Sequence, residues 1–162
     1  MEKKSDSTQE APTAEQDARQ RAAYILLNVF AGRWNTEGKT RARDSSTAMK
    51  IKGTDTYEWL EGGYFLVHYV DVKVGAEILK AIEIIGYDAE GNNYPTHSFD
   101  SQGNSGTYQA SVHDGIWTFR GKSERATIVI GQDGDKMTAH WEQLTNSQDW
   151  VPWMDIELTK EK

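Results

Sequence analysis

The fold of this chain is decided by one stretch, Lys80–Gln143, which has the sequence KAIEIIGYDAEGNNYPTHSFDSQGNSGTYQASVHDGIWTFRGKSERATIVIGQDGDKMTAHWEQ. Within it, turn-forming residues return about every 8–12 positions, the spacing of a β-meander that folds into a sandwich or a barrel. Glycine, asparagine and aspartate suit such turns because they tolerate the positive φ of tight hairpins. The turn segments are Ala89–Asn92, Ser101–Asn104, His113–Gly115, Gly121–Ser123 and Gln132–Asp135.

Between these turns, apolar and polar residues alternate, as they do in strands with one buried face. Met137, Ala139 and Trp141 alternate with polar neighbours, and Trp117 and Phe119 flank Thr118 in the same way. The alternation predicts that these side chains point inward. We expect strands at about 80–88, 93–100, 105–112, 116–121, 124–131 and 136–143, and a last strand with Met154, Ile156 and Leu158 on one face.

The segment before the meander adds one helix. Thr13 and Gln16 have the spacing of a capping box, in which each side chain bonds the other residue's backbone N–H. We expect a helix over about residues 14–30 that lies on or plugs one end of the sheet, and a disordered polar tail over residues 1–12. Residues 13–162 then form a single domain. The helical apolar positions are Ala23, Leu26, Leu27 and Phe30.

Further strands precede the meander. A first strand begins at Gly32, and residues 41–47 are expected to form a polar loop. Residues 64–72 form an apolar strand, followed by a short connection at 74–77 that could hold one helical turn. A period of two over residues 49–59 predicts that the odd positions face inward, namely Met49, Ile51, Tyr57 and Trp59.

About ten antiparallel strands can form an open sheet, a sandwich or a closed barrel. An open sheet of this size leaves long edges that promote aggregation. Short, even hairpins without long crossovers favour up-and-down closure. We therefore expect an all-β, lipocalin-like barrel, whose interior has room for side chains and one small ligand.

Composition excludes several classes of function. The 162 residues carry a formal net charge of −7, which argues against nucleic acid as a partner, since phosphate binding needs Lys and Arg. The chain has no cysteine, so disulfides and cysteine-ligated metals are excluded. No segment is long and apolar enough to span a membrane, and no basic amphipathic helix favours a membrane surface. The N-terminus does not resemble a signal peptide, and we expect a cytoplasmic location.

Several phrases of the sequence occur together in an order that resembles a known family. They are Leu27-x-x-Phe-Ala-Gly-x-Trp34 with Gly38, Trp59-Leu-Glu-Gly-Gly-Tyr-Phe-Leu66, Ile85-Gly-Tyr-Asp88, Phe99-Asp-Ser-x-Gly103, Trp141-Glu and Trp153-Met-x-Ile. Over about residues 27–160 the chain is similar to the bacterial lipocalin-like family catalogued as domain of unknown function 1579. The resemblance implies a calycin-type barrel of about ten strands, and it carries over no catalytic residue.

The Gly-x-Trp phrase that ends at Trp34 is also similar to nitrobindin-type haem barrels, in which a late histidine ligates iron. In this chain the glycine run after the tryptophan is reduced to Gly38, and the late histidine, His140, is expected to point outward. We expect no cofactor, and neither an H-E-x-x-H nor a His-x-His metal pattern occurs. Trp34 itself is expected to close one end of the barrel.

The candidate site is the barrel lumen. Aromatic side chains on inward faces could line a pocket for a flat apolar ligand, or they could fill the interior. His68 shares a face with Leu66 and Val70, and His97 shares one with Phe99. His68, Tyr69 or His97 would supply a polar anchor. The full set of candidate ligand-binding residues is Tyr57, Trp59, His68, Tyr69, His97, Trp117 and Trp141.

Four functions stay open from the sequence. The first is a module that binds a small hydrophobic molecule in the lumen. The second is a barrel enzyme of the cyclase or isomerase type, with an inward histidine or carboxylate as acid or base. The third is a haem or gas-binding barrel, and the fourth is a packed structural domain that acts through its outer face or as a homodimer. Asp88 and Asp100 could be paired as acid and base, but strand-end aspartates more often bond turn backbone.

Overall fold

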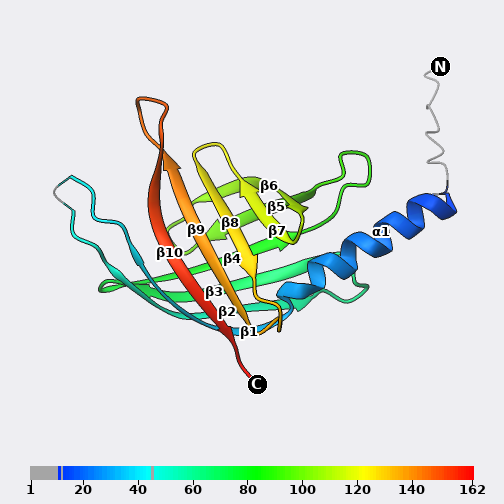
Figure 1. Ribbon diagram of the computed structural model, residues 1–162, viewed down its shortest axis with the longest axis horizontal. Coiled ribbons are helices and arrows are strands. Elements are labelled where there is room, and N and C mark those ends of the chain that lie inside the picture. The colour runs from blue at the N-terminus through cyan, green and yellow to red at the C-terminus, as the bar shows by residue number, and fades with distance from the viewer. Residues whose placement is uncertain (1–10, 12, 45) are drawn as a thin grey trace, which may run out of the picture.

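The computed structural model describes residue 11 and residues 13–162 except residue 45, so most of the expected disordered tail lies outside the described residues. Ten antiparallel strands form a closed barrel, in which β1 pairs with both β2 and β10 (Figure 1). The prediction of an up-and-down barrel of about ten strands is confirmed. The strands are β1 (Gly32–Thr40), β2 (Lys50–Trp59), β3 (Leu66–Val74), β4 (Glu77–Ile85), β5 (Tyr94–Asp100), β6 (Ser105–His113), β7 (Ile116–Arg120), β8 (Glu124–Ile130), β9 (Lys136–Leu144) and β10 (Trp150–Lys160).

Two glycines lie where the first strands of the barrel approach their neighbours most closely. A Cβ atom at Gly53 would overlap the backbone of β3, lying 2.6 Å from the Cα atom of Val72. A Cβ atom at Gly38 would overlap the backbone of β10 in the same way. The side chain that any other residue would carry here would push β1 and β2 away from their partners, so glycine permits the tight curvature that closes the barrel.

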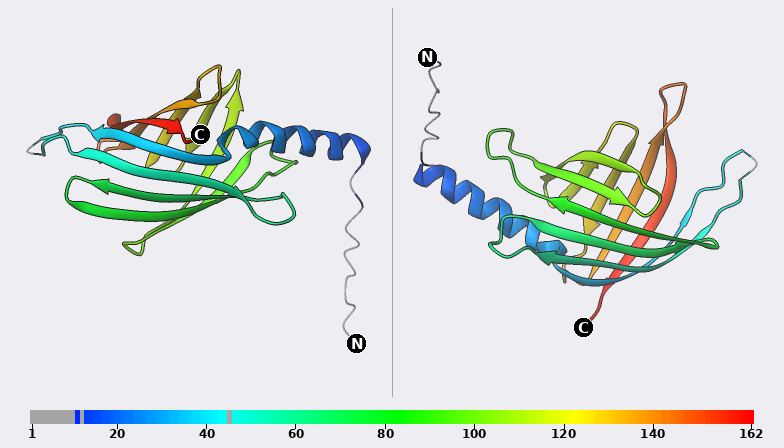
Figure 2. Two further views of the ribbon diagram at one scale, coloured as in Figure 1. Left: turned by 90° about the horizontal axis from the view of Figure 1, so that it is seen from below. Right: turned by 180° about the vertical axis from the view of Figure 1, so that it is seen from behind.

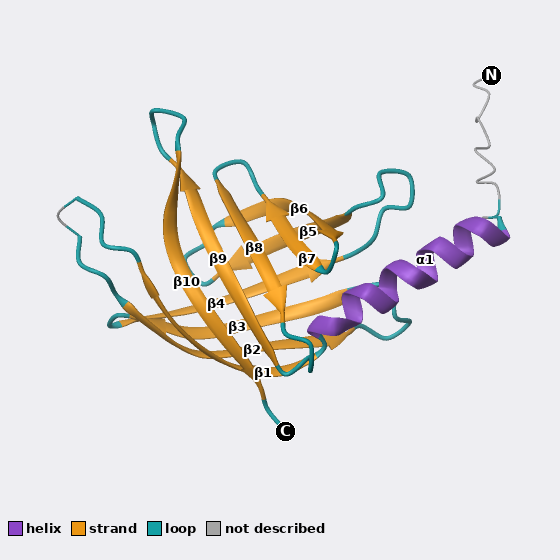
Figure 3. Cartoon of the chain, in the orientation of Figure 1, coloured by secondary structure: helices purple, strands orange, loops and turns teal. Residues whose placement is uncertain are grey.

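Helix α1 (Ala14–Leu27) begins with the capping box expected from the sequence. Gln16 donates its backbone N–H to the Thr13 hydroxyl, and the Gln16 side chain accepts the Thr13 N–H. The helix ends in a single 3₁₀ turn, η1 (Asn28–Phe30). It is the only helix longer than one turn within the described residues (Figure 3).

Only the C-terminal part of α1 packs on the barrel, and its N-terminal part projects away from it (Figure 2). Ala23, Leu27 and Phe30 are buried, as expected, but Leu26 is 48% exposed. The expected apolar stripe was therefore too wide, because a projecting helix buries only the residues that meet the barrel's rim. The helices of the described residues do not include one long and apolar enough to cross a membrane.

The core fills the helix end of the barrel. Phe30 lies 5.1 Å from Trp117 and 5.4 Å from Tyr57, measured between ring centroids. Trp34 is fully buried and donates its indole N–H to the Phe30 carbonyl at 2.8 Å, so its expected role in closing the barrel end is confirmed. Large aromatic side chains supply much burial energy, and here they seal one end of the lumen.

The connections follow the predicted turns with small differences. The connection between β3 and β4 is a two-residue turn with Gly75 at φ 60°, and it contains no helical turn. A turn this short joins two directly paired strands, which leaves no residues for a helix. Asp88 and Asp100 accept hydrogen bonds from turn backbone N–H groups, as expected for aspartates at strand ends.

Candidate functional site

Beyond the aromatic layer that seals the helix end, the barrel encloses a cavity of about 260 Å³. Its lining includes Val74, Asp100 and Trp153, so it extends toward the end opposite the helix. Figure 1 shows the β1–β2 and β9–β10 connections at that end. Most of its wall is apolar, and the polar side chains come from β1 to β6 and from β8. The apolar wall includes Ile51, Val70, Val72, Leu79, Ile85, Phe119, Ile128, Met137, Ala139, Trp141, Trp153, Met154, Ile156 and Leu158.

The strand register places three polar side chains in one row across the wall. Tyr57 on β2 pairs with His68 on β3, and His68 pairs with Glu83 on β4. Directly paired residues in neighbouring strands project on the same side of the sheet, so all three face the lumen. The rings of Tyr57 and His68 are stacked, with centroids 3.9 Å apart and planes 6° from parallel.

His68 bridges two carboxylates. Its Nε2 atom lies 2.6 Å from Asp55 Oδ1, and its Nδ1 atom lies 2.8 Å from Glu83 Oε1. The Thr36 hydroxyl donates to the second oxygen of Asp55. The side chains of His68, Asp55 and Glu83 are only 9%, 10% and 16% exposed, so these contacts are shielded from bulk water.

The two carboxylates keep His68 protonated. Burial alone would lower the pKa of His68, but the hydrogen bonds to Asp55 and Glu83 and the charges of these carboxylates outweigh it and raise the pKa to about 9. An imidazolium donates through both nitrogens, which matches the two contacts. Neither ring nitrogen is then free to ligate a metal or to abstract a proton.

Tyr57 is a neutral phenol next to this charged group. Burial, and then the charges of Asp55 and Glu83, hold the pKa of Tyr57 well above its ordinary value. Its hydroxyl has no hydrogen bond within the described part of the chain. This oxygen is still accessible, because it is not one of the buried unpartnered polar atoms found there. Because Tyr57 lines the cavity, this hydroxyl can donate to or accept from a molecule in the lumen.

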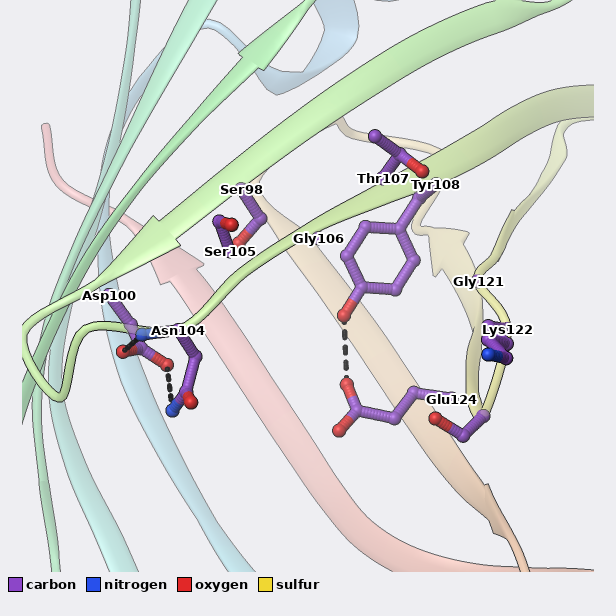
Figure 4. Close-up of a pocket in the computed structure, with 11 residues that line it drawn as sticks. Ser98, Asp100, Asn104, Ser105, Gly106, Thr107, Tyr108, Gly121, Lys122 and Glu124 are labelled. Carbon is purple, nitrogen blue, oxygen red and sulfur yellow. Dashed lines mark hydrogen bonds between the residues drawn. The ribbon is translucent and has the colours of Figure 1, made fainter.

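A second polar group lies where the wall opens sideways (Figure 4). Strand β7 has only five residues, so it pairs with the second half of β6 and leaves the first half without a partner on that side. A pocket lies there, and it shares Ser98, Asp100, Tyr108 and Glu124 with the lumen. The Tyr108 hydroxyl donates to Glu124 Oε2 at 2.8 Å across this opening. The lateral pocket and the lumen therefore share part of one wall.

The structure brings three of the seven candidate residues together at the cavity. Tyr57, His68 and Trp141 line it. Trp117 is buried in the aromatic layer at the helix end, where its ring contacts Phe30. Trp59 lies at the rim and donates its indole N–H to Asn28 Oδ1 at 2.8 Å, which ties β2 to η1.

Tyr69 and His97 lie on the outer face of the barrel. Tyr69 is 46% exposed, and His97 shares its face with Phe99, which is 47% exposed. Tyr69, Ile82 and Phe99 are directly paired across β3, β4 and β5. Cross-strand contacts between aromatic and β-branched side chains stabilise a sheet even on its solvent-exposed face. Such contacts explain why these apolar residues lie there.

Sequence reasoning missed the carboxylates of the site. Asp55 lies at an odd position of β2, between the inward residues Ile51 and Tyr57, so the period of two already pointed to it. Glu83 gave no such signal, because the outward residues Ile82 and Ile84 on β4 are apolar as well. The missed lumen residues with polar side chains are Thr36, Asp55, Glu83, Ser98, Asp100, Tyr108 and Glu124.

His113 and His140 are not part of the cavity lining. His140 is on the outer face, as expected, with its Nδ1 atom 2.7 Å from Asp155 Oδ1 and its side chain 42% exposed. His113, the last residue of β6, is 95% exposed, so it lies just before the turn in which the sequence placed it. Across the described residues, no group of three or more His, Cys, Asp or Glu side chains is arranged to hold a metal ion.

Comparisons with known proteins agree on the architecture. A family model described as protein of unknown function (DUF1579) matches residues 20–157. The barrel is similar to the crystal structure of Rv2717c from M. tuberculosis, at 11% identity and a TM-score of 0.63, over 86% of this chain and 98% of that one. It is also similar to the S-type phycobiliprotein lyase CPES from Guillardia theta, at 9% identity and a TM-score of 0.54, over 93% and 99% of the two chains. At these identities the likeness shows the fold. No curated protein matches the sequence.

Proposed function

The chain belongs to the DUF1579 family, and we propose that its barrel binds a small, largely apolar molecule in the lumen. One observation carries the proposal: a cavity of about 260 Å³ with apolar walls and a few converging polar groups. Binding sites for small molecules commonly combine these two features. The volume is just below the range of about 300–1,000 Å³ typical of ligand pockets, which favours a compact ligand.

The aromatic side chains support a flat ligand. Trp141 and Trp153 line the cavity, with ring centroids 6.1 Å apart and planes 83° from parallel. An aromatic ligand gains from edge-to-face and stacked contacts with such rings in addition to the burial of its surface. The Guillardia theta protein with a similar barrel is named a phycobiliprotein lyase. The proposal for this chain depends on the cavity and not on that name.

The state of His68 argues against two of the alternatives for this side chain. A cyclase or isomerase would need a group that can exchange a proton, and the two carboxylates of Asp55 and Glu83 engage both nitrogens of His68. A haem ligand needs a free nitrogen lone pair, which an imidazolium lacks. We therefore place His68 in the binding site as a group that positions Glu83 and Tyr57.

Titration with the neutral fluorophore N-phenyl-1-naphthylamine tests lumen binding. The decisive comparison uses two neighbours on β9: Ala139 is buried and lines the cavity, and Thr138 is exposed on the outer face. Ala139→Phe places a ring inside the cavity, and we expect it to weaken binding by about tenfold or more. Thr138→Phe adds the same ring outside and should leave the affinity unchanged. Equal binding by both variants would show that the fluorophore binds elsewhere.

The cytoplasmic location expected from the sequence remains part of the proposal. Fractionation of cells that produce the full chain would test it.

A further inference from the structure

The charged side chains around the lumen are almost all of one sign. Among the described residues, four carboxylates line it, from Asp55, Glu83, Asp100 and Glu124, and His68 is the one cationic group in that lining. No described lysine or arginine belongs to it; Lys122 lines only the lateral pocket outside. A fatty acid or another anion would therefore meet repulsion in this lumen and find no cationic side chain free to pair with.

The buried group around His68 has more negative charge than positive. One imidazolium serves two carboxylates, so its formal charge is −1. Both oxygens of Asp55 are engaged, one by His68 and one by Thr36. Glu83 uses only Oε1, for His68, and no hydrogen bond to its Oε2 is found among the described residues. An uncompensated buried charge is costly, so a cation in the cavity would stabilise this arrangement.

The lateral opening adds to the negative potential. Figure 4 shows the Tyr108 hydroxyl directed at the Glu124 carboxylate, while Asp100 is turned to Asn104 in its own turn. Burial, the Glu124 hydrogen bond and the charges of Glu124, Glu83 and Asp100 all raise the pKa of Tyr108. The three carboxylates and Tyr108 line the same cavity. Asp100 is committed to turn backbone, which leaves Glu83 and Glu124 to meet a ligand.

Tyr57 supplies an independent sign that the lumen receives a polar atom. It is only 6% exposed, and its hydroxyl faces the cavity without a hydrogen-bond partner in the described chain. The hydroxyl oxygen is open to the cavity, so a polar atom of a molecule in the lumen can bond it. A ligand N–H group near Glu83 could donate to this oxygen as well, since Tyr57 and Glu83 flank His68 in the same row.

We propose that the ligand of the lumen is a protonated amine with an apolar, aromatic body. Its ammonium group pairs with the carboxylates of Glu83 and Glu124, and its ring system lies against Trp141 in the apolar part of the cavity. It enters beside Tyr108, where the lateral pocket and the lumen share Glu124. This assignment rests on the proposed function and names the chemical class of its ligand.

Three probes of the same shape test the assignment: 4-phenylbutylamine, 4-phenyl-1-butanol and 4-phenylbutyrate. Each displaces N-phenyl-1-naphthylamine from the full-length protein at neutral pH. We expect the amine to bind about tenfold or more tightly than the alcohol, and the acid to bind most weakly, because hydrogen bonds to a charged partner are the stronger ones. Glu83→Gln and, separately, Glu124→Gln should each narrow the gap between amine and alcohol severalfold without weakening the alcohol.

Glu77→Gln is the matched control, because Glu77 is on the same strand as Glu83 but exposed. It should keep the wild-type preference for the amine. If Glu83→Gln fails to fold, the affinity ranking of the three probes for the wild type and for Glu124→Gln still tests the amine assignment. Equal binding of all three probes, or an amine preference that survives in every folded variant, would overturn the amine assignment while lumen binding stands. Failure of the fluorophore itself to bind would remove the proposed function.

Discussion

The salt-bridged histidine inside the barrel makes the stability of this protein depend on pH in an unusual direction. The folded-state pKa of His68 is about 9, above its ordinary value of 6.5. A raised pKa stabilises the fold fully below the unfolded value, about pH 6.5, and this stabilisation is lost as the pH rises through about 9. At about 1.4 kcal/mol for each pKa unit, the loss is about 3 kcal/mol.

The measurement is urea unfolding of the wild type and of His68→Gln at pH values from about 6 to 9.5, a range that spans the window between the two pKa values. Glutamine keeps a hydrogen-bond donor but has no charge to titrate. The difference in unfolding free energy between the two proteins should shrink by about 3 kcal/mol across this range. Taking the difference removes the titration of groups that both proteins share.

Proton NMR of the imidazole rings reports the same event directly. The other histidines, His97, His113 and His140, lie on the outer face or at the end of a strand, and His68 alone is buried. We expect one ring to titrate near pH 9 in the wild type and to be missing from His68→Gln. A midpoint for His68 near 6.5, or a stability difference that does not change with pH, would refute the argument that the two carboxylates hold a proton on this ring.

Two further predictions concern the same wall of the barrel. Asp55→Asn removes one partner of the buried group, and we expect it to lower the unfolding free energy by about 3–5 kcal/mol; Asp71→Asn, which breaks an exposed pair with Lys80, should cost less than about 1 kcal/mol. Gly53→Ala forces a Cβ atom onto the β3 backbone and should cost about 1–3 kcal/mol or more, whereas Gly106→Ala, with open space around it, should change stability by less than about 0.5 kcal/mol. Urea unfolding measures all four, and equal effects within either pair would contradict the reasoning for that pair.

The architecture could be predicted from the sequence because turn-forming residues mark where each strand ends. Glycine, asparagine and aspartate mark most hairpins of the meander, and such turns leave little choice but sequential antiparallel pairing. The inward positions of Met137, Ala139 and Trp141 followed from a strict alternation. Where alternation was clear, most inward positions were predicted correctly. Met49 is an exception: it precedes β2 and is 45% exposed, because the alternation was extended one residue beyond the strand.

The site was predicted only in part, because the pattern of polar and apolar residues did not reveal which side chains of every strand face inward. On β5 the inward positions include Thr96 and Ser98, while the apolar Phe99 points outward, so the pattern favoured the wrong side for His97. The group around His68 depends on the register between β2, β3 and β4, which a single sequence does not specify. Its carboxylates become neighbours only after these strands are paired.

The most direct test of the account is a crystal structure of the full chain grown with 4-phenylbutylamine. The account predicts density for the amine inside the barrel, with its ring against Trp141 and its nitrogen within hydrogen-bond distance of Glu83 or Glu124. Density only on the outer face, or a lumen closed by its own side chains, would contradict the claim that this barrel is a binding site.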